Sequence, residues 1–114
     1  MQPITTSGQF PHGLTIAGVT YTRFDMREAL LADMIDAEAE SGGPAAAIHY
    51  NAQLAVRQLT RVTSAEGQEY KGPFTVGMVK KRGDFLALRQ AQLELDKLGN
   101  AAPSTTDSTG TPSN

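Results

Sequence analysis

The chain has 114 residues, 39% of them hydrophobic, and its 10 Lys and Arg against 12 Asp and Glu give a net charge of −2. This length suits one domain with a modest core. The charge balance lacks the basic field of a nucleic-acid-binding protein, and the absence of Cys excludes disulfides and thiolate chemistry. No apolar run approaches the ~20 residues that cross a bilayer, and no signal peptide is recognisable. We therefore expect a cytoplasmic protein that binds neither nucleic acid nor a membrane.

The N-terminal part is predicted to be a polar arm followed by a β-hairpin. Residues 1–12 show no hydrophobic period and are assigned to the arm. Over residues 13–23, apolar and polar residues alternate on both sides of a two-residue turn at residues 17–18. This turn pairs Ile16 with Val19 and places the apolar side chains on one face. A lone hairpin is marginally stable in water, so we expect that face to pack on helices.

Helical spacing of apolar residues dominates the rest of the chain. Four helices are predicted, over about residues 26–41, 44–63, 75–82 and 84–98. Asp25 stands three residues before Glu28 and so has the spacing of an N-terminal cap. Gly42 lies where the first helix is expected to end. Because only a short link joins the first two helices, they are expected to lie antiparallel.

The last predicted helix begins at an Asp cap and is followed by a polar tail. Asp84 stands at its start, and its apolar stripe is formed by Phe85, Leu88, Ala91, Leu95 and Leu98. Residues 100–114 are rich in Pro, Ser and Thr, have nothing to bury and are predicted to be disordered. The predicted fold class is therefore mainly α (α+β), with an N-terminal hairpin, a cluster of three or four antiparallel helices and a disordered C-terminal tail.

Two groups of polar residues could carry chemistry. Asp33, Asp36 and Glu40 fall on one face of the first predicted helix, where they indicate either a carboxylate metal site or a solvated face. A metal site needs ligands from more than one element, so we favour the solvated face. His12 and His49 have no Ser or Cys partner at a catalytic spacing, so we expect boundary histidines. The sequence therefore predicts no catalytic residue, no cofactor and no metal site.

A protein-binding surface is the function that the residues favour. Six residues are predicted to contact a partner: Leu30, Leu31, Met34, Ile35, Arg57 and Arg61. The four apolar ones form a wider arc than one helix contact requires, and the alternative for each is burial in the chain's own core. The two arginines lie one turn apart on the second predicted helix, where they either meet carboxylates of a partner or of the first helix, or are solvated. The Lys-Lys-Arg run at residues 80–82 is expected to be solvated.

The order of these features is similar to that of a known family. The likeness extends over about residues 13–98, and its segments are the hairpin 14–21, FDMREA at 24–29, DAE at 36–38, LAVRQL at 54–59, GPFTV at 72–76 and DFLAL at 84–88. In this order they resemble the tail assembly chaperones of long-tailed, Mu-like bacteriophages and prophages. The motifs are helix starts and apolar positions, with no catalytic residue among them.

The resemblance implies a partner and a role. Chaperones of this family bind the long, helical tape-measure protein in the host cytoplasm and keep it soluble until tail-tube subunits polymerise around it. They are often made in a short and a frameshifted longer form, of which this chain would be the short one, so the longer form is a second expected partner. Three alternatives remain open, namely a small structural tail or connector protein of the virion, another helical protein-protein adaptor, and a small enzyme.

Overall fold

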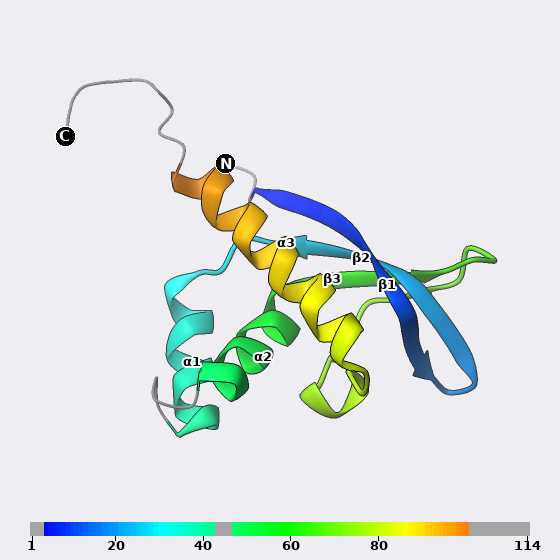
Figure 1. Cartoon of the computed structure of the whole chain (residues 1–114), viewed down its shortest axis with the longest axis horizontal. Helices are drawn as coiled ribbons and strands as arrows, with labels where there is room; N and C mark the ends of the chain where they lie inside the picture. The colour runs from blue at the N-terminus through cyan, green and yellow to red at the C-terminus, as the bar shows by residue number, and fades with distance from the viewer. Residues whose placement is uncertain (1–3, 43–46, 101–114) are drawn as a thin grey trace.

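The computed structural model describes residues 4–42 and 47–100, which form a four-stranded sheet and three α-helices. In chain order the elements are β1 (Thr5–Ile16), β2 (Val19–Arg27), α1 (Leu31–Ser41), α2 (Ala47–Gln58), β3 (Leu59–Ser64), β4 (Glu69–Tyr70), the short 3₁₀ helix η1 (Val76–Met78) and α3 (Arg82–Asn100). The sheet is antiparallel with the order β1-β2-β3-β4, and α1 and α2 are inserted between the adjacent strands β2 and β3 (Figure 1).

The fold is therefore α+β with a substantial N-terminal sheet, and the prediction of a mainly helical protein is wrong. Two segments account for the difference. Residues 5–12, predicted to be an arm, belong to β1, where Thr5 pairs with Arg27 and Gly8 with Phe24 of β2. Residues 59–63, predicted to end the second helix, lie in β3, whose Val62 pairs with Phe24. Strand pairing across the sheet, which local periodicity does not reveal, decides both segments.

The hairpin turn has the predicted register. Ile16 pairs with Val19, and Leu14 with Tyr21. Ala17 and Gly18 both have positive φ, at 51° and 83°, as a type I′ turn requires for two strands that twist together. The hairpin is longer than predicted, however, because an irregularity between Gln9 and Leu14 lets pairing continue to the start of β1.

Helix α1 begins at Leu31, five residues later than predicted, because residues 26 and 27 still pair in β2. Asp25 lies in β2 and caps no helix. Asp33 supplies the missing acceptor instead, since its Oδ2 accepts a hydrogen bond from the Leu30 backbone N–H at 2.9 Å. The helix ends at Ser41, and Gly42 follows in the left-handed conformation with φ 85°, as predicted.

The later boundaries also shift. Helix α2 ends at Gln58 rather than at residue 63, and the predicted start at residue 44 lies outside the described residues. In place of a helix over 75–82 the chain has only η1. Asp84 lies inside the first turn of α3 and does not cap it; its Oδ1 accepts from the His12 N–H at 2.9 Å and fixes β1 to this helix. Residue 100, assigned to the predicted tail, is still part of α3, and residues 101–114 lie outside the described residues.

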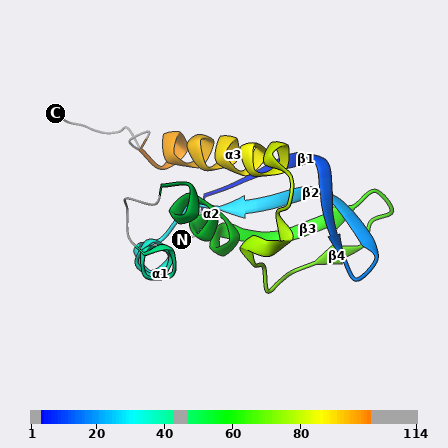
Figure 2. The same ribbon diagram turned by 60° about the horizontal axis from the view of Figure 1, so that its bottom comes forward.

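The core lies between the sheet and α3. Figure 2 shows α3 running along the sheet, α2 beside it, and α1 beyond α2. From α3, Leu88, Ala91 and Leu95 are buried as predicted, whereas Leu98 is exposed. They pack on side chains of the sheet that include Phe10, Leu14, Phe24 and Met26. The inward face of the sheet and one stripe of α3 thus form the hydrophobic core.

Two buried amides connect the helices to the sheet. Gln92 Nε2 of α3 donates to Gln58 Oε1 of α2 at 2.9 Å and to the Asn51 carbonyl at 3.2 Å. Gln58 Nε2 donates in turn to the Arg27 carbonyl of β2 at 3.0 Å. A buried amide is tolerated only when its polar atoms find partners, so this chain of bonds fixes the end of α2 relative to both neighbours.

Candidate protein-binding surfaces

The first candidate surface, here called the α1 surface, lies at the start of α1. Its members are Leu30, Leu31, Met34 and Ile35, with 51%, 70%, 37% and 58% of their area exposed. All four are apolar residues that the sequence assigns to partner binding, and none of them lies in the core. Met34 sits at the edge of the surface, where it lines a hollow of about 190 Å³ with Leu95 and Gly99 of α3.

The exposure follows from the position of α1 in the fold. The helix packs chiefly against α2, so only one of its sides is covered. Ala37 and Ser41 are buried and mark that side. At 100° per residue, Leu31 and Ile35 project away from it. The outward side of α1 is therefore an apolar stripe, and the exposed carboxylates of Asp36, Glu38 and Glu40 lie alongside it.

A partly buried ion pair fixes the start of α1. The guanidinium of Arg27 donates from Nη1 and Nη2 to Asp33 Oδ2 and Oδ1 at 2.7 and 3.1 Å. These hydrogen bonds hold the pKa of Asp33 below its ordinary value, against the opposing effect of burial, and the nearby charge of Arg57 acts in the same direction. Both oxygens of Asp33 are thus engaged by Arg27, and among the described residues no group of His, Asp or Glu is arranged to hold a metal ion.

The structure separates the two arginines that the sequence places one turn apart. Arg57 lies on α2, donates to the Gln53 carbonyl at 2.9 Å, and shares a hollow of about 400 Å³ with Glu40 of α1. Arg61 lies on β3, where its Nε is 2.8 Å from Asp25 Oδ2 of β2. Arg57 therefore belongs to the neighbourhood of α1, and Arg61 does not.

Arg61 is part of a polar ladder across the helix-free face of the sheet. Ser7 Oγ donates to Asp25 Oδ1 at 2.6 Å, and Arg61 Nη1 lies 3.1 Å from Glu69 Oε2. Burial alone would raise the pKa of Asp25, but the hydrogen bonds from Ser7 and Arg61 outweigh it and lower that pKa below the ordinary value. These cross-strand pairs stabilise the sheet, and they pair Arg61 with carboxylates of β2 and β4 rather than with carboxylates of α1.

The two histidines lie on different elements and do not form a site. His49 is exposed on α2, with its Nε2 3.2 Å from Gln53 Nε2 on the same helix. His12 lies on β1, with its ring beside Gly83 at the start of α3. Neither contacts a hydroxyl group that it could activate by general base catalysis, as far as the described residues extend.

A second surface, here called the basic groove, was missed by sequence reasoning. It is a groove of about 590 Å³ lined by Ala47, Ile48 and Asn51 of α2, by Val79, Lys80 and Lys81, and by Arg82, Phe85, Leu86 and Arg89 of α3. Ile48 is 75% exposed here, and Leu86 is 50% exposed. The cluster of Lys and Arg around Phe85 and Leu86 could have indicated this surface in the sequence. The part that α2 contributes is apparent only once α2 and α3 are seen to pack side by side.

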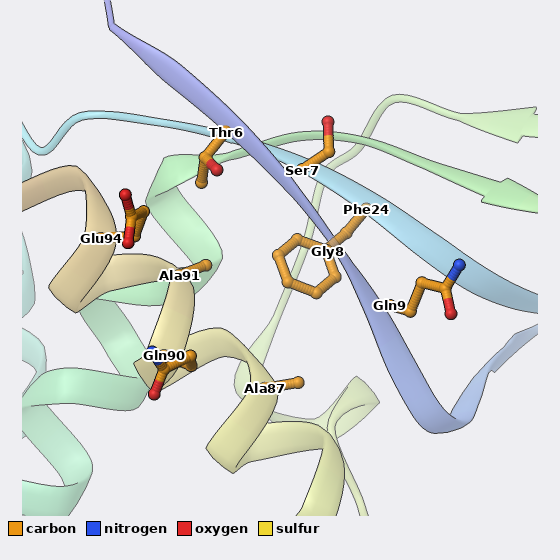
Figure 3. Close-up of a pocket in the computed structure, with 9 residues that line it drawn as sticks. All are labelled: Thr6, Ser7, Gly8, Gln9, Phe24, Ala87, Gln90, Ala91 and Glu94. Atoms are coloured by element: carbon orange, nitrogen blue, oxygen red, sulfur yellow. The ribbon is translucent and has the colours of Figure 1, made fainter. Parts of the chain in front are cut away.

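A smaller pocket of about 270 Å³ lies between β1 and α3 (Figure 3). The Phe24 ring lies against this pocket under Gly8, and a Cβ at Gly8 would overlap the ring. Among its lining residues Glu94 is the one ionisable side chain. A single carboxylate offers neither a nucleophile with its base nor an acid-base pair, so we interpret this pocket as a packing gap.

Along residues 4–42 and 47–100, no helix is both long enough and apolar enough to cross a membrane. The described residues offer two surfaces of apolar and charged side chains, the α1 surface and the basic groove. Compared with protein-family models, with curated proteins and with solved structures, the chain has no match.

Proposed function

We propose that this protein is a non-enzymatic assembly chaperone that covers apolar stripes of a helical partner with its α1 surface. The observation that carries the proposal is the exposure of Leu31 and Ile35 on a helix whose opposite side is already packed. Contiguous exposed apolar groups that no neighbouring element covers are typical of interaction sites. An amphipathic helix can lay such groups along the apolar stripe of another helix.

The resemblance of the chain to tail assembly chaperones names the partner in this proposal. The partner is the tape-measure protein, a long helical chain whose apolar stripes need cover until tail-tube subunits enclose it. The work takes place in the cytoplasm of the bacterial host, and a frameshifted longer form of this chain shares the task. Arg57 and Glu40, which lie together beside α1, supply polar contacts at the edge.

The size of the α1 surface suits a contact that must later be released. Burying a Leu or Ile side chain completely contributes about 1.5–3 kcal/mol. Leu31 and Ile35 are 70% and 58% exposed, so covering both contributes about 2–4 kcal/mol before the cost of association is subtracted. Several chaperone copies along one tape measure give tight retention together, while each copy leaves easily when tube subunits arrive.

The test is co-expression of this chain with a candidate tape-measure protein from the same genome. The wild-type chain is expected to keep that protein in the soluble fraction and to co-purify with it. The double variant Leu31→Asp, Ile35→Asp is expected to fold, because both side chains are exposed, and to lose the partner, because the new charges cannot be covered by an apolar stripe.

Leu93→Asp is the matched control, since Leu93 is exposed on α3, a different helix, and its replacement is expected to leave partner binding intact. Partner binding that survives in the double variant would contradict the role of the α1 surface. Recovery of the wild-type chain as a stoichiometric part of finished virions would replace the chaperone proposal with that of a structural tail or connector protein.

A further inference from the structure

The basic groove combines exposed apolar surface with positive charges that have no acidic partner among the described residues. Ile48, Phe85 and Leu86 provide its apolar lining. Lys80, Lys81 and Arg82 lie around it, and none of the three forms an ion pair with any described residue. Arg89 adds a fourth cation, whose Nη1 donates to Gln92 Oε1 at 2.6 Å. The matching occupant is therefore a short helix with an apolar stripe and acidic flanks.

Helix α1 of the same sequence has this chemistry. Its outward stripe contains Leu31 and Ile35, and the carboxylates of Asp36, Glu38 and Glu40 are exposed beside it. These three carboxylates form no ion pair within the described part of the chain. Asp36 and Glu40 flank the stripe on one side and Glu38 on the other, so the helix has the acidic flanks that match the cations around the groove.

The two surfaces cannot meet within one molecule. Helix α1 packs on α2 through the side that holds Ala37 and Ser41, so its apolar stripe points away from its own α2 and from the groove at the start of α2 and α3. We infer that the basic groove of one copy holds helix α1 of a second copy. Because the two surfaces differ, the contact is heterologous, and it adds further copies head to tail.

The area of the contact predicts a weak and salt-dependent association. An 11-residue helix is about 16 Å long and covers much less than the roughly 800 Å² per partner of a stable complex. We therefore expect a Kd on the order of 0.1 mM. Exposed charges are screened at high ionic strength, so the association is expected to weaken as salt is added.

Sedimentation of the full chain over about 10 µM to 1 mM tests the inference. The wild-type chain is expected to form a continuous series of oligomers as its concentration rises. The α1 variant (Leu31→Asp, Ile35→Asp) and a groove variant (Ile48→Asp, Leu86→Asp) are each expected to stay monomeric. All four positions are half or more exposed, so both variants are expected to keep the wild-type circular dichroism spectrum.

Mixing the two variants gives the decisive result. The groove variant retains an intact α1, and the α1 variant retains an intact groove, so one contact can form and no second one can follow. A 1:1 dimer that does not grow is expected. Three results would each overturn the inference: a wild-type chain that stays monomeric throughout, a groove variant that self-associates like the wild type, or a mixture that stays monomeric. If the wild-type chain stays monomeric, the groove is instead a site for an acidic helix of another protein.

This inference stands apart from the proposed function, and the same variants separate the two. The groove variant is expected to lose self-association and to keep tape-measure binding, whereas the α1 variant is expected to lose both. Self-association without tape-measure binding would contradict the proposed function alone. Tape-measure binding by a wild-type chain that stays monomeric would contradict the inference alone.

Discussion

Asp33 joins the sheet to the helices through three donors. Its Oδ2 accepts from the Leu30 N–H at 2.9 Å and from Arg27 Nη1 at 2.7 Å, while its Oδ1 accepts from Arg27 Nη2 at 3.1 Å. The side chains of Arg27 and Asp33 are only 24% and 14% exposed, so solvent screens the pair weakly. A second donation, from Arg27 Nη2 to the Arg57 carbonyl at 3.0 Å, extends the connection to the end of α2.

Asp33→Asn is expected to lower the free energy of unfolding by about 1–3 kcal/mol at pH 7, because it removes a charged acceptor from two hydrogen bonds to Arg27. The pKa of Asp33 in the folded chain lies below the unfolded value of about 3.9. Its contribution is therefore present above the unfolded pKa and is lost as the pH falls through the folded pKa. Urea unfolding of both chains between about pH 7 and pH 3 measures the difference.

Asp36→Asn serves as the control for this experiment. Asp36 lies on the same helix, is exposed and makes no ion pair with the described residues, so its replacement is expected to change stability by less than about 0.5 kcal/mol. A difference between wild type and Asp33→Asn that stays constant from neutral to acid pH would show that the carboxylate charge does not stabilise the junction.

At the scale of single elements, α1 and α3 are stabilised in different ways. Helix α3 is held by one apolar stripe in the core, by the Asp84 contact to β1 and by the amide of Gln92. Helix α1 relies on its contact with α2 and on the Arg27–Asp33 pair, and much of its apolar surface is left exposed. The core element is therefore α3, and α1 is the element available for contacts outside the chain.

Two leucines on α3 provide a matched test of this difference. Leu95 is 1% exposed and Leu93 is 47% exposed. Leu95→Ala is expected to lower the free energy of unfolding by about 2–5 kcal/mol, because it leaves a cavity against the sheet. Leu93→Ala on the same helix is expected to cost less than about 1 kcal/mol. Equal losses in denaturant unfolding of the two variants would contradict the placement of the core on this stripe.

The sequence predicts those elements whose signals are local. The turn at Ala17 and Gly18, the end of α1 at Gly42 and the buried positions Leu88 and Leu95 all follow from residue type and spacing. The fold class does not, because β1 and β3 are defined by their pairing with β2. Leu59 and Val62, three residues apart, fit a helical stripe as well as they fit a strand, and nothing local separates the two.

The two candidate surfaces also differ in how far the sequence predicts them. Leu30 to Ile35 form one continuous segment, so an apolar arc too wide for a single contact could be recognised in the sequence. The basic groove combines residues near 48 with residues 79–89, and only the packing of α2 beside α3 brings them together. Arg57 and Arg61 are close in sequence but contact different neighbours, because the chain changes from helix to strand between them.

At the scale of the whole molecule, the two proposals compete for one surface. A copy whose α1 lies in the groove of its neighbour has no free stripe for the tape-measure protein. We expect the apparent affinity of the wild-type chain for a soluble tape-measure fragment to fall as the chaperone concentration rises, measured by isothermal titration. The groove variant, which cannot cover α1, is expected to show one affinity at all concentrations. A wild-type affinity that is also independent of concentration would contradict the competition.

The insertion of α1 and α2 between two neighbouring strands has an evolutionary consequence. Leu31 and Ile35 are exposed on α1 and lie outside the hydrophobic core, so they can be substituted during evolution at little cost to folding. The binding surface is then expected to change faster in evolution than the fold. Homologues of this chain are expected to conserve the strands and to diverge most at the exposed residues of α1, which contact the partner.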